Sequence, residues 1–86
     1  MQKARANLAK HQVSFEEAQT VFTDPFALIF DDEWQSAGEP REIIIGHSAQ
    51  NRLLLVSFTE RPGGLIRIIS SRETTRSERI EYEENI

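Results

Sequence analysis

The chain has 86 residues, 38% of them hydrophobic, with a net charge of −4 and no cysteine. We expect one domain over residues 1–86, with a core near the lower limit for independent folding. Without cysteine, disulfides and thiolate metal ligands are excluded. No stretch approaches the roughly 20 apolar residues of a membrane span, and the first residues lack the apolar core of a signal peptide. These features predict a cytoplasmic protein without membrane contact.

The charge is unevenly distributed along the chain. Residues 1–40 carry −4, residues 41–79 carry +3 because they hold seven arginines, and residues 80–86 carry −3. A local basic surface can therefore coexist with an acidic total. Such a surface suffices to grip a short RNA segment, whereas a protein that coats long duplex DNA needs more positive charge.

Two helices are predicted in the N-terminal part of the chain. Good helix formers over residues 3–10 predict the first. Ser14, with Glu17 three positions later, is the capping-box pattern that begins the second. Pro25 ends that helix, because the residue before a proline avoids helical geometry.

A third helix is predicted near the C-terminus. Thr75 and Glu78 repeat the capping-box pattern and indicate a helix over residues 76–84. We expect Ile80 and Tyr82 to face the interior, with Tyr82 serving packing rather than chemistry.

The remaining apolar runs indicate strands, the first of them short and buried. A polar loop over residues 31–40 follows that strand, and a tight turn at residues 62–64 joins the last two. Short connections favour an antiparallel meander, because parallel strands need long crossovers. The fold class expected is α+β: an antiparallel meander sheet with two N-terminal helices and one C-terminal helix. The strands are predicted at residues 26–30, 42–46, 52–59 and 65–71.

Four arginines cluster where the last strand gives way to the last helix: Arg67, Arg72, Arg76 and Arg79. A guanidinium group is a planar, permanently charged fork that suits phosphate oxygens. We expect this patch to read phosphates, with Lys10, Arg76 and Arg79 binding RNA.

A two-residue turn at residues 63–64 would set Glu60 opposite Arg67 on one face of the sheet. Metal-free RNA cleavage needs a base for the 2′-hydroxyl proton, cations for the phosphorane and an acid for the leaving 5′-oxygen. Geometry by itself favours the alternative, an ordinary cross-strand ion pair. The catalytic candidates are Glu60 as the base, Arg67 and Arg72 as the phosphate clamp, and His11 or Lys10 as the acid.

No metal or other cofactor is expected. The acidic run at residues 31–33 fits a solvated loop better than a cation site, because consecutive carboxylates have poor ligand geometry. Trp34, the only tryptophan, is expected to pack against a partner or the core rather than to stack on a base.

Three segments, residues 7–18, 58–61 and 65–84, together resemble the BrnT family of bacterial type II toxins. The resemblance extends over residues 3–82. It implies a RelE-like fold, a ribonuclease that halts translation and a BrnA-like antitoxin partner, with DNA bound only through the antitoxin complex. The resemblance also favours a catalytic role for Glu60 and Arg67 over an ordinary cross-strand ion pair.

A second function stays open on the residues alone: a non-catalytic module of the same fold that binds an antitoxin and contributes to operator DNA binding. Relatives in the family usually begin with a short strand, whereas Met1 stands almost directly before the first predicted helix. An unpaired sheet edge is a template for association. We therefore expect the chain to self-associate or to gain stability from its antitoxin, which electrostatic steering would bring to the arginine face.

Overall fold

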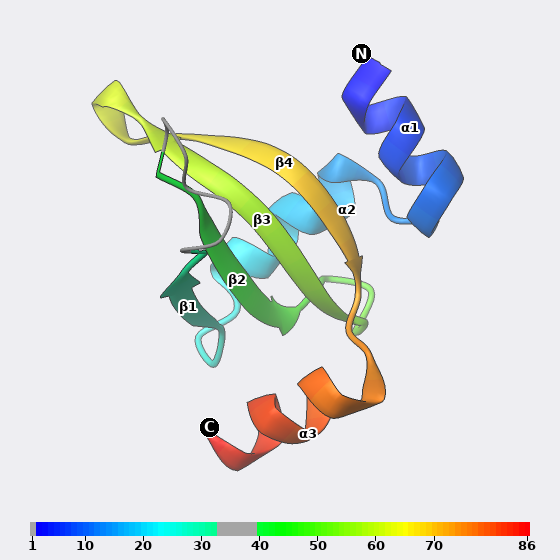
Figure 1. Cartoon of the computed structure of the whole chain (residues 1–86), viewed down its shortest axis with the longest axis vertical. Coiled ribbons are helices and arrows are strands. Elements are labelled where there is room, and N and C mark those ends of the chain that lie inside the picture. The colour runs from blue at the N-terminus through cyan, green and yellow to red at the C-terminus, as the bar shows by residue number, and fades with distance from the viewer. Residues whose placement is uncertain (1, 33–39) are drawn as a thin grey trace.

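The structure, a computed structural model, describes residues 2–32 and 40–86. The strands form one sheet in the order β1-β2-β3-β4, and every neighbouring pair is antiparallel (Figure 1). This confirms the predicted α+β class with its meander. The elements in chain order are α1 (Gln2–His11), α2 (Phe15–Thr20), η1 (Val21–Thr23), β1 (Leu28–Asp31), β2 (Glu42–His47), β3 (Leu53–Arg61), η3 (Pro62–Gly64), β4 (Leu65–Glu73) and α3 (Arg76–Glu84).

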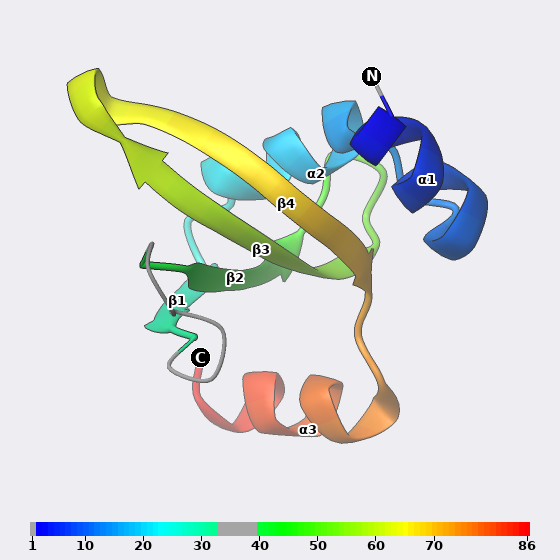
Figure 2. The same cartoon turned by 45° about the horizontal axis from the view of Figure 1, so that its top comes forward.

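The sheet is the middle layer of the molecule, with α1 and α2 over one face and α3 over the other (Figure 2). Side chains along a strand alternate between the faces. On the α2 face, Leu54, Val56 and Phe58 pack with Val13 and Val21 in one buried cluster. The opposite face carries a smaller cluster made by Ile45, Leu53 and Tyr82.

The caps explain where two of the helices begin. The Thr75 side chain accepts a hydrogen bond from the Glu78 N–H, and the Glu78 carboxylate accepts one from the Thr75 N–H, so the predicted capping box is confirmed. Ser14 likewise accepts from the Glu17 N–H at 3.0 Å. The Glu17 carboxylate turns instead toward Ser48 and Arg52.

Two burial predictions were wrong. The first strand begins at Leu28 and lies at the sheet edge, where Ile29 and Phe30 are exposed. Among the strands of residues 2–32 and 40–86 it pairs only with β2, so no other described strand adjoins its second side. On α3, Tyr82 is buried as predicted, but Ile80 is 47% exposed because it lies on the outward side of the helix. Tyr82 also donates a hydrogen bond from its hydroxyl to the Phe26 carbonyl.

The hairpin register differs from the prediction. The turn has three residues, Pro62–Gly64, rather than two. This sets Glu60 opposite Ile66 and Arg67 opposite Thr59. Opposed residues share a face and consecutive residues alternate, so Glu60 and Arg67 point to opposite faces. The predicted Glu60–Arg67 pair is therefore wrong.

Three predictions fall wholly or partly on residues outside the described ranges: the polar loop over residues 31–40, the acidic run at residues 31–33 and the packing of Trp34. Asp31, the first residue of the predicted loop, still belongs to β1. Among the described helices, none is long and apolar enough to cross a membrane.

Candidate functional site

A cavity of about 530 Å³ lies between the end of α1 and the point where β4 leads into α3. We call it the α1–β4 pocket. Lys10, His11 and Gln12 line it from the helix end. The other lining residues are Arg52, Arg72, Glu73 and Thr75. A lysine, a histidine, two arginines and a carboxylate thus meet around one open space.

Asn7 fixes the end of α1 beside β4. Its side-chain amide donates to the carbonyls of Val13 and Ser71 at 2.8 and 2.9 Å, and its carbonyl accepts from the Ser71 N–H at 2.9 Å. The helix ends where Gln12 adopts a left-handed φ of 58°. Lys10 and His11 occupy the last helical turn, where positive charge complements the helix dipole.

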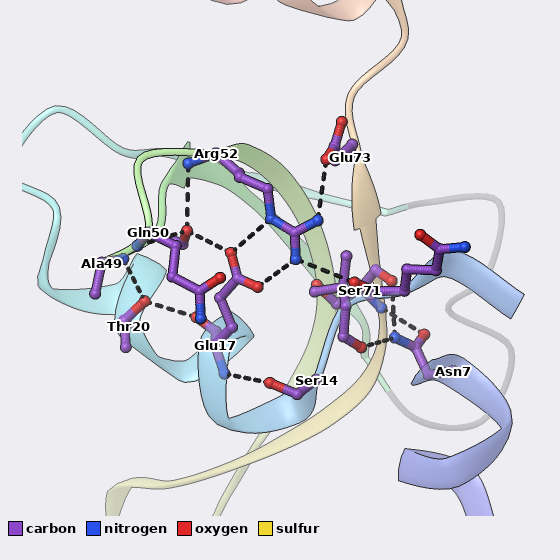
Figure 3. Close-up of polar contacts among 12 residues, drawn as sticks. Asn7, Ser14, Glu17, Thr20, Ala49, Gln50, Arg52, Ser71 and Glu73 are labelled. Carbon is purple, nitrogen blue, oxygen red and sulfur yellow. Dashed lines mark hydrogen bonds and ion pairs between the residues drawn. The ribbon is translucent and has the colours of Figure 1, made fainter. Parts of the chain in front are cut away.

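Arg52 ties three elements together beneath the pocket (Figure 3). Its guanidinium forms a bidentate ion pair with Glu17 on α2. It also donates to the Gln12 carbonyl at the end of α1 and to the Glu73 carboxylate at the end of β4, both at 3.1 Å. These contacts occupy four of its five N–H donors, so Arg52 holds the site together and is poorly placed to take up a phosphate.

Glu17 is a buried carboxylate, 5% exposed. Besides the pair with Arg52, it accepts a hydrogen bond of 2.6 Å from the Ser48 hydroxyl. These hydrogen bonds, chiefly those from Arg52, hold the pKa of Glu17 below its ordinary value despite burial, which acts the other way. Sequence reasoning missed this role, because Glu17 stands three residues after Ser14 and fits a capping box.

Arg72 is held by Glu78 in a second bidentate pair, with nitrogen–oxygen distances of 2.8 and 2.9 Å. The hydrogen bonds from Arg72 are the largest cause that lowers the pKa of Glu78 to about 2. The Arg72 side chain is nevertheless 36% exposed. It lines both the α1–β4 pocket and a cavity of about 480 Å³ on the α3 side of the sheet.

The structure brings some of the predicted site residues together and separates others. Lys10, His11 and Arg72 meet in the α1–β4 pocket. Arg67 lies five positions before Arg72 on β4, about 16 Å along an extended strand. It lines a different cavity, and Glu60 is exposed near the same hairpin end.

The two remaining arginines belong to α3. Arg76 and Arg79 are exposed, and Arg76 follows Thr75, which lines the pocket. Sequence reasoning overlooked Glu73, although its position at the strand end beside Arg72 was a usable signal. No group of three histidine, aspartate or glutamate side chains capable of holding a metal ion occurs in residues 2–32 and 40–86.

The fold and this pocket define a small α+β protein with a basic, histidine-containing pocket where a helix end meets a strand-to-helix junction. The chain belongs to the BrnT family: the model described as "Ribonuclease toxin, BrnT, of type II toxin-antitoxin system" matches residues 1–78. The resemblance seen in the sequence is thereby confirmed. The protein is a ribonuclease toxin of a type II toxin-antitoxin system, which implies a cognate antitoxin and an RNA substrate. No curated protein sequence matches the chain.

Proposed function

We propose that the toxin inhibits translation by cleaving RNA in the α1–β4 pocket without a metal ion. The observation that carries the proposal is the convergence of His11, Lys10 and Arg72 with the Glu73 carboxylate around one cavity. These groups are the base, acid and cations that transfer of the phosphoryl group to the 2′-oxygen requires.

In the proposed reaction Glu73 takes the proton of the 2′-hydroxyl as the 2′-oxygen attacks the phosphorus. Arg72 and Lys10 stabilise the negative charge of the phosphorane. His11 donates a proton to the departing 5′-oxygen, since it is the imidazole that lines the pocket and histidine is the side chain that most often transfers protons in catalysis. The products are a 2′,3′-cyclic phosphate and a 5′-hydroxyl.

Glu73 suits the role of base because it is accessible and oriented. Its side chain is 59% exposed, and its carboxylate accepts a hydrogen bond of 3.1 Å from Arg52. Arg52 is in turn fixed by the buried Glu17. One carboxylate oxygen of Glu73 is thus anchored by Arg52, while the side chain as a whole stays accessible. Glu60 and Arg67 lie outside the pocket and have no part in this proposal.

Arg76 extends the positive surface beyond the pocket, because it is exposed and adjoins the pocket residue Thr75. The next turn of α3 adds Arg79, which is also exposed. An RNA strand that enters the pocket can therefore be held by further phosphate contacts along α3, and these contacts carry no base specificity.

Inducible expression tests the proposal. Wild type should arrest growth and degrade RNA, and purified toxin should leave 2′,3′-cyclic phosphate ends in the presence of EDTA. His11→Ala and Glu73→Gln should each relieve the arrest and reduce the cleavage rate by about 100-fold or more. His47→Ala is the matched control for His11→Ala, because His47 lies at the end of β2 and outside the pocket.

Equal toxicity of His11→Ala, Glu73→Gln and wild type would refute the assignment of this pocket. Healthy growth and intact RNA at verified expression of the wild type would favour the other function, a non-catalytic module that binds an antitoxin and operator DNA.

A further inference from the structure

An apolar groove lies on the α1 and α2 face of the sheet, between α1, α2 and the hairpin half of β4. Two cavities of about 370 and 730 Å³ form it, and they share Phe15, Ile66 and Ile68. Phe22 lines the smaller cavity, and its ring packs edge-on against Phe58 with centroids 4.9 Å apart. The groove therefore has an aromatic and aliphatic floor supported by the core.

The groove is open because the β3–β4 hairpin extends beyond the two helices (Figures 1 and 2). Ile66, near the start of β4, is 42% exposed as a result. Apolar side chains gathered in an open groove, rather than scattered singly, are typical of a surface that a partner covers.

The rim of the groove is charged differently at its two ends. Lys3 on α1 lines the wider cavity, and none of the described residues that line it is acidic. Glu16 and Gln19 on α2 line the narrower one. A segment that fits has apolar side chains for the floor and an acidic residue at the end beside Lys3, because opposite charges across an interface fix its register.

We propose that this groove binds an amphipathic segment of the cognate antitoxin, with apolar side chains on Phe15 and Ile66 and an acidic side chain beside Lys3. The inference rests on the protein acting as a toxin with an antitoxin. Packing of an apolar helix face into such a groove is a recurrent recognition mode. An RNA strand matches it poorly, because the floor offers no cationic track for phosphates.

The groove and the α1–β4 pocket lie at opposite ends of β4, which carries Ile66 in one and Arg72 in the other. The antitoxin segment in the groove therefore supplies affinity without itself filling the pocket. A second part of the antitoxin must cover the pocket if neutralisation blocks RNA access directly.

Calorimetric titration of the purified toxin with its purified cognate antitoxin tests the groove. Ile66→Ser should weaken binding by about tenfold or more, as expected for a central apolar contact. Leu65→Ser is the matched control, because Leu65 is 68% exposed and lies on the other face of β4. Lys3→Glu should weaken binding most at low salt. Its control is Arg5→Glu on the same helix, which does not line the groove.

Melting temperatures of all four variants show whether each one folds. Binding is the readout, so failure of the α1–β4 pocket to cleave RNA would leave this inference intact. Wild-type affinity for both Ile66→Ser and Lys3→Glu, or no binding by the wild-type toxin, would overturn it. So would a toxin dimer that Ile66→Ser disrupts while antitoxin affinity is unchanged, because the occupant would then be a second copy of the chain.

Discussion

Asn7 on α1 forms with Ser71 on β4 the pair of hydrogen bonds that a neighbouring strand would form. The amide donates to the Ser71 carbonyl and accepts from the Ser71 N–H, each at 2.9 Å. Since β4 is an edge strand, one side chain replaces a strand partner at this position and closes the edge. Self-association through the remainder of the edge stays a prediction.

Asn7→Ala is expected to lower the free energy of unfolding by about 2 to 3 kcal/mol, because it leaves buried backbone groups without partners. It should also speed hydrogen exchange at Ser71 and reduce RNA cleavage, since the α1 end with His11 loses its anchor. Denaturant unfolding and exchange measure these effects. Asn85→Ala, which removes an exposed amide, should cost less than about 0.5 kcal/mol. Equal losses for both would contradict the role of Asn7.

Arg52→Ala is expected to lower the free energy of unfolding by about 3 kcal/mol, because it leaves the buried Glu17 carboxylate without its cation. Arg5→Ala, at an exposed helix position, serves as the control and should stay within about 0.5 kcal/mol of wild type. Urea titrations of both variants measure these free energies of unfolding. If Arg52→Ala unfolds at the wild-type midpoint, the buried pair does not support the fold.

Acid should destabilise the protein between pH 4.5 and about 2. The pKa of Glu78 falls from an ordinary 4.5 to about 2 in the folded state, chiefly through hydrogen bonds from Arg72. In this window the unfolded chain binds more protons, so stability decreases as the pH falls. Glu17, with a lowered pKa, acts in the same direction.

Glu78→Gln should flatten the pH dependence of the melting temperature in that window, whereas Glu81→Gln, exposed on the same helix, should not. If the melting temperatures of Glu78→Gln and wild type change with pH in parallel, the Arg72–Glu78 pair contributes nothing to the acid destabilisation.

Double-mutant cycles can test the hairpin register. Glu60 and Arg67 point to opposite faces, so their coupling energy should be near zero. Arg72 and Glu78 form a bidentate pair and should couple by about 1 kcal/mol, a high value for a partly exposed pair. A substantial Glu60–Arg67 coupling would restore the register predicted from the sequence.

RNA affinity should fall steeply with salt. If Lys10, Arg72 and Arg76 each neutralise one phosphate, the log–log slope should be about −2 for single-stranded RNA. Fluorescence anisotropy between low and physiological salt gives the slope. Arg72→Ala should make it shallower by about 0.7. A flat dependence in the wild type would exclude phosphate contacts as the source of affinity.

Local patterns in the sequence determined much of the fold. The Thr75–Glu78 capping box places the start of α3 correctly, because a cap needs only residues within one helical turn. The apolar runs and the short connections between them likewise predict the antiparallel meander, because they too are local features of the sequence. The arginine cluster and the Lys10–His11 pair also indicate the end of β4 where the proposed site lies, since basic side chains at a helix end and a strand-to-helix junction are visible in the sequence.

Only the tertiary structure decided which of these residues lie close together in space. A third residue in the Pro62–Gly64 turn shifts the hairpin register by one position, and such a shift moves a side chain to the other face of the sheet. The Glu60–Arg67 pair is lost in this way. Glu73 and His11 are far apart in the sequence and meet because Asn7 and Arg52 dock the end of α1 against β4. Contacts between distant segments depend on how the layers pack, which no local pattern encodes.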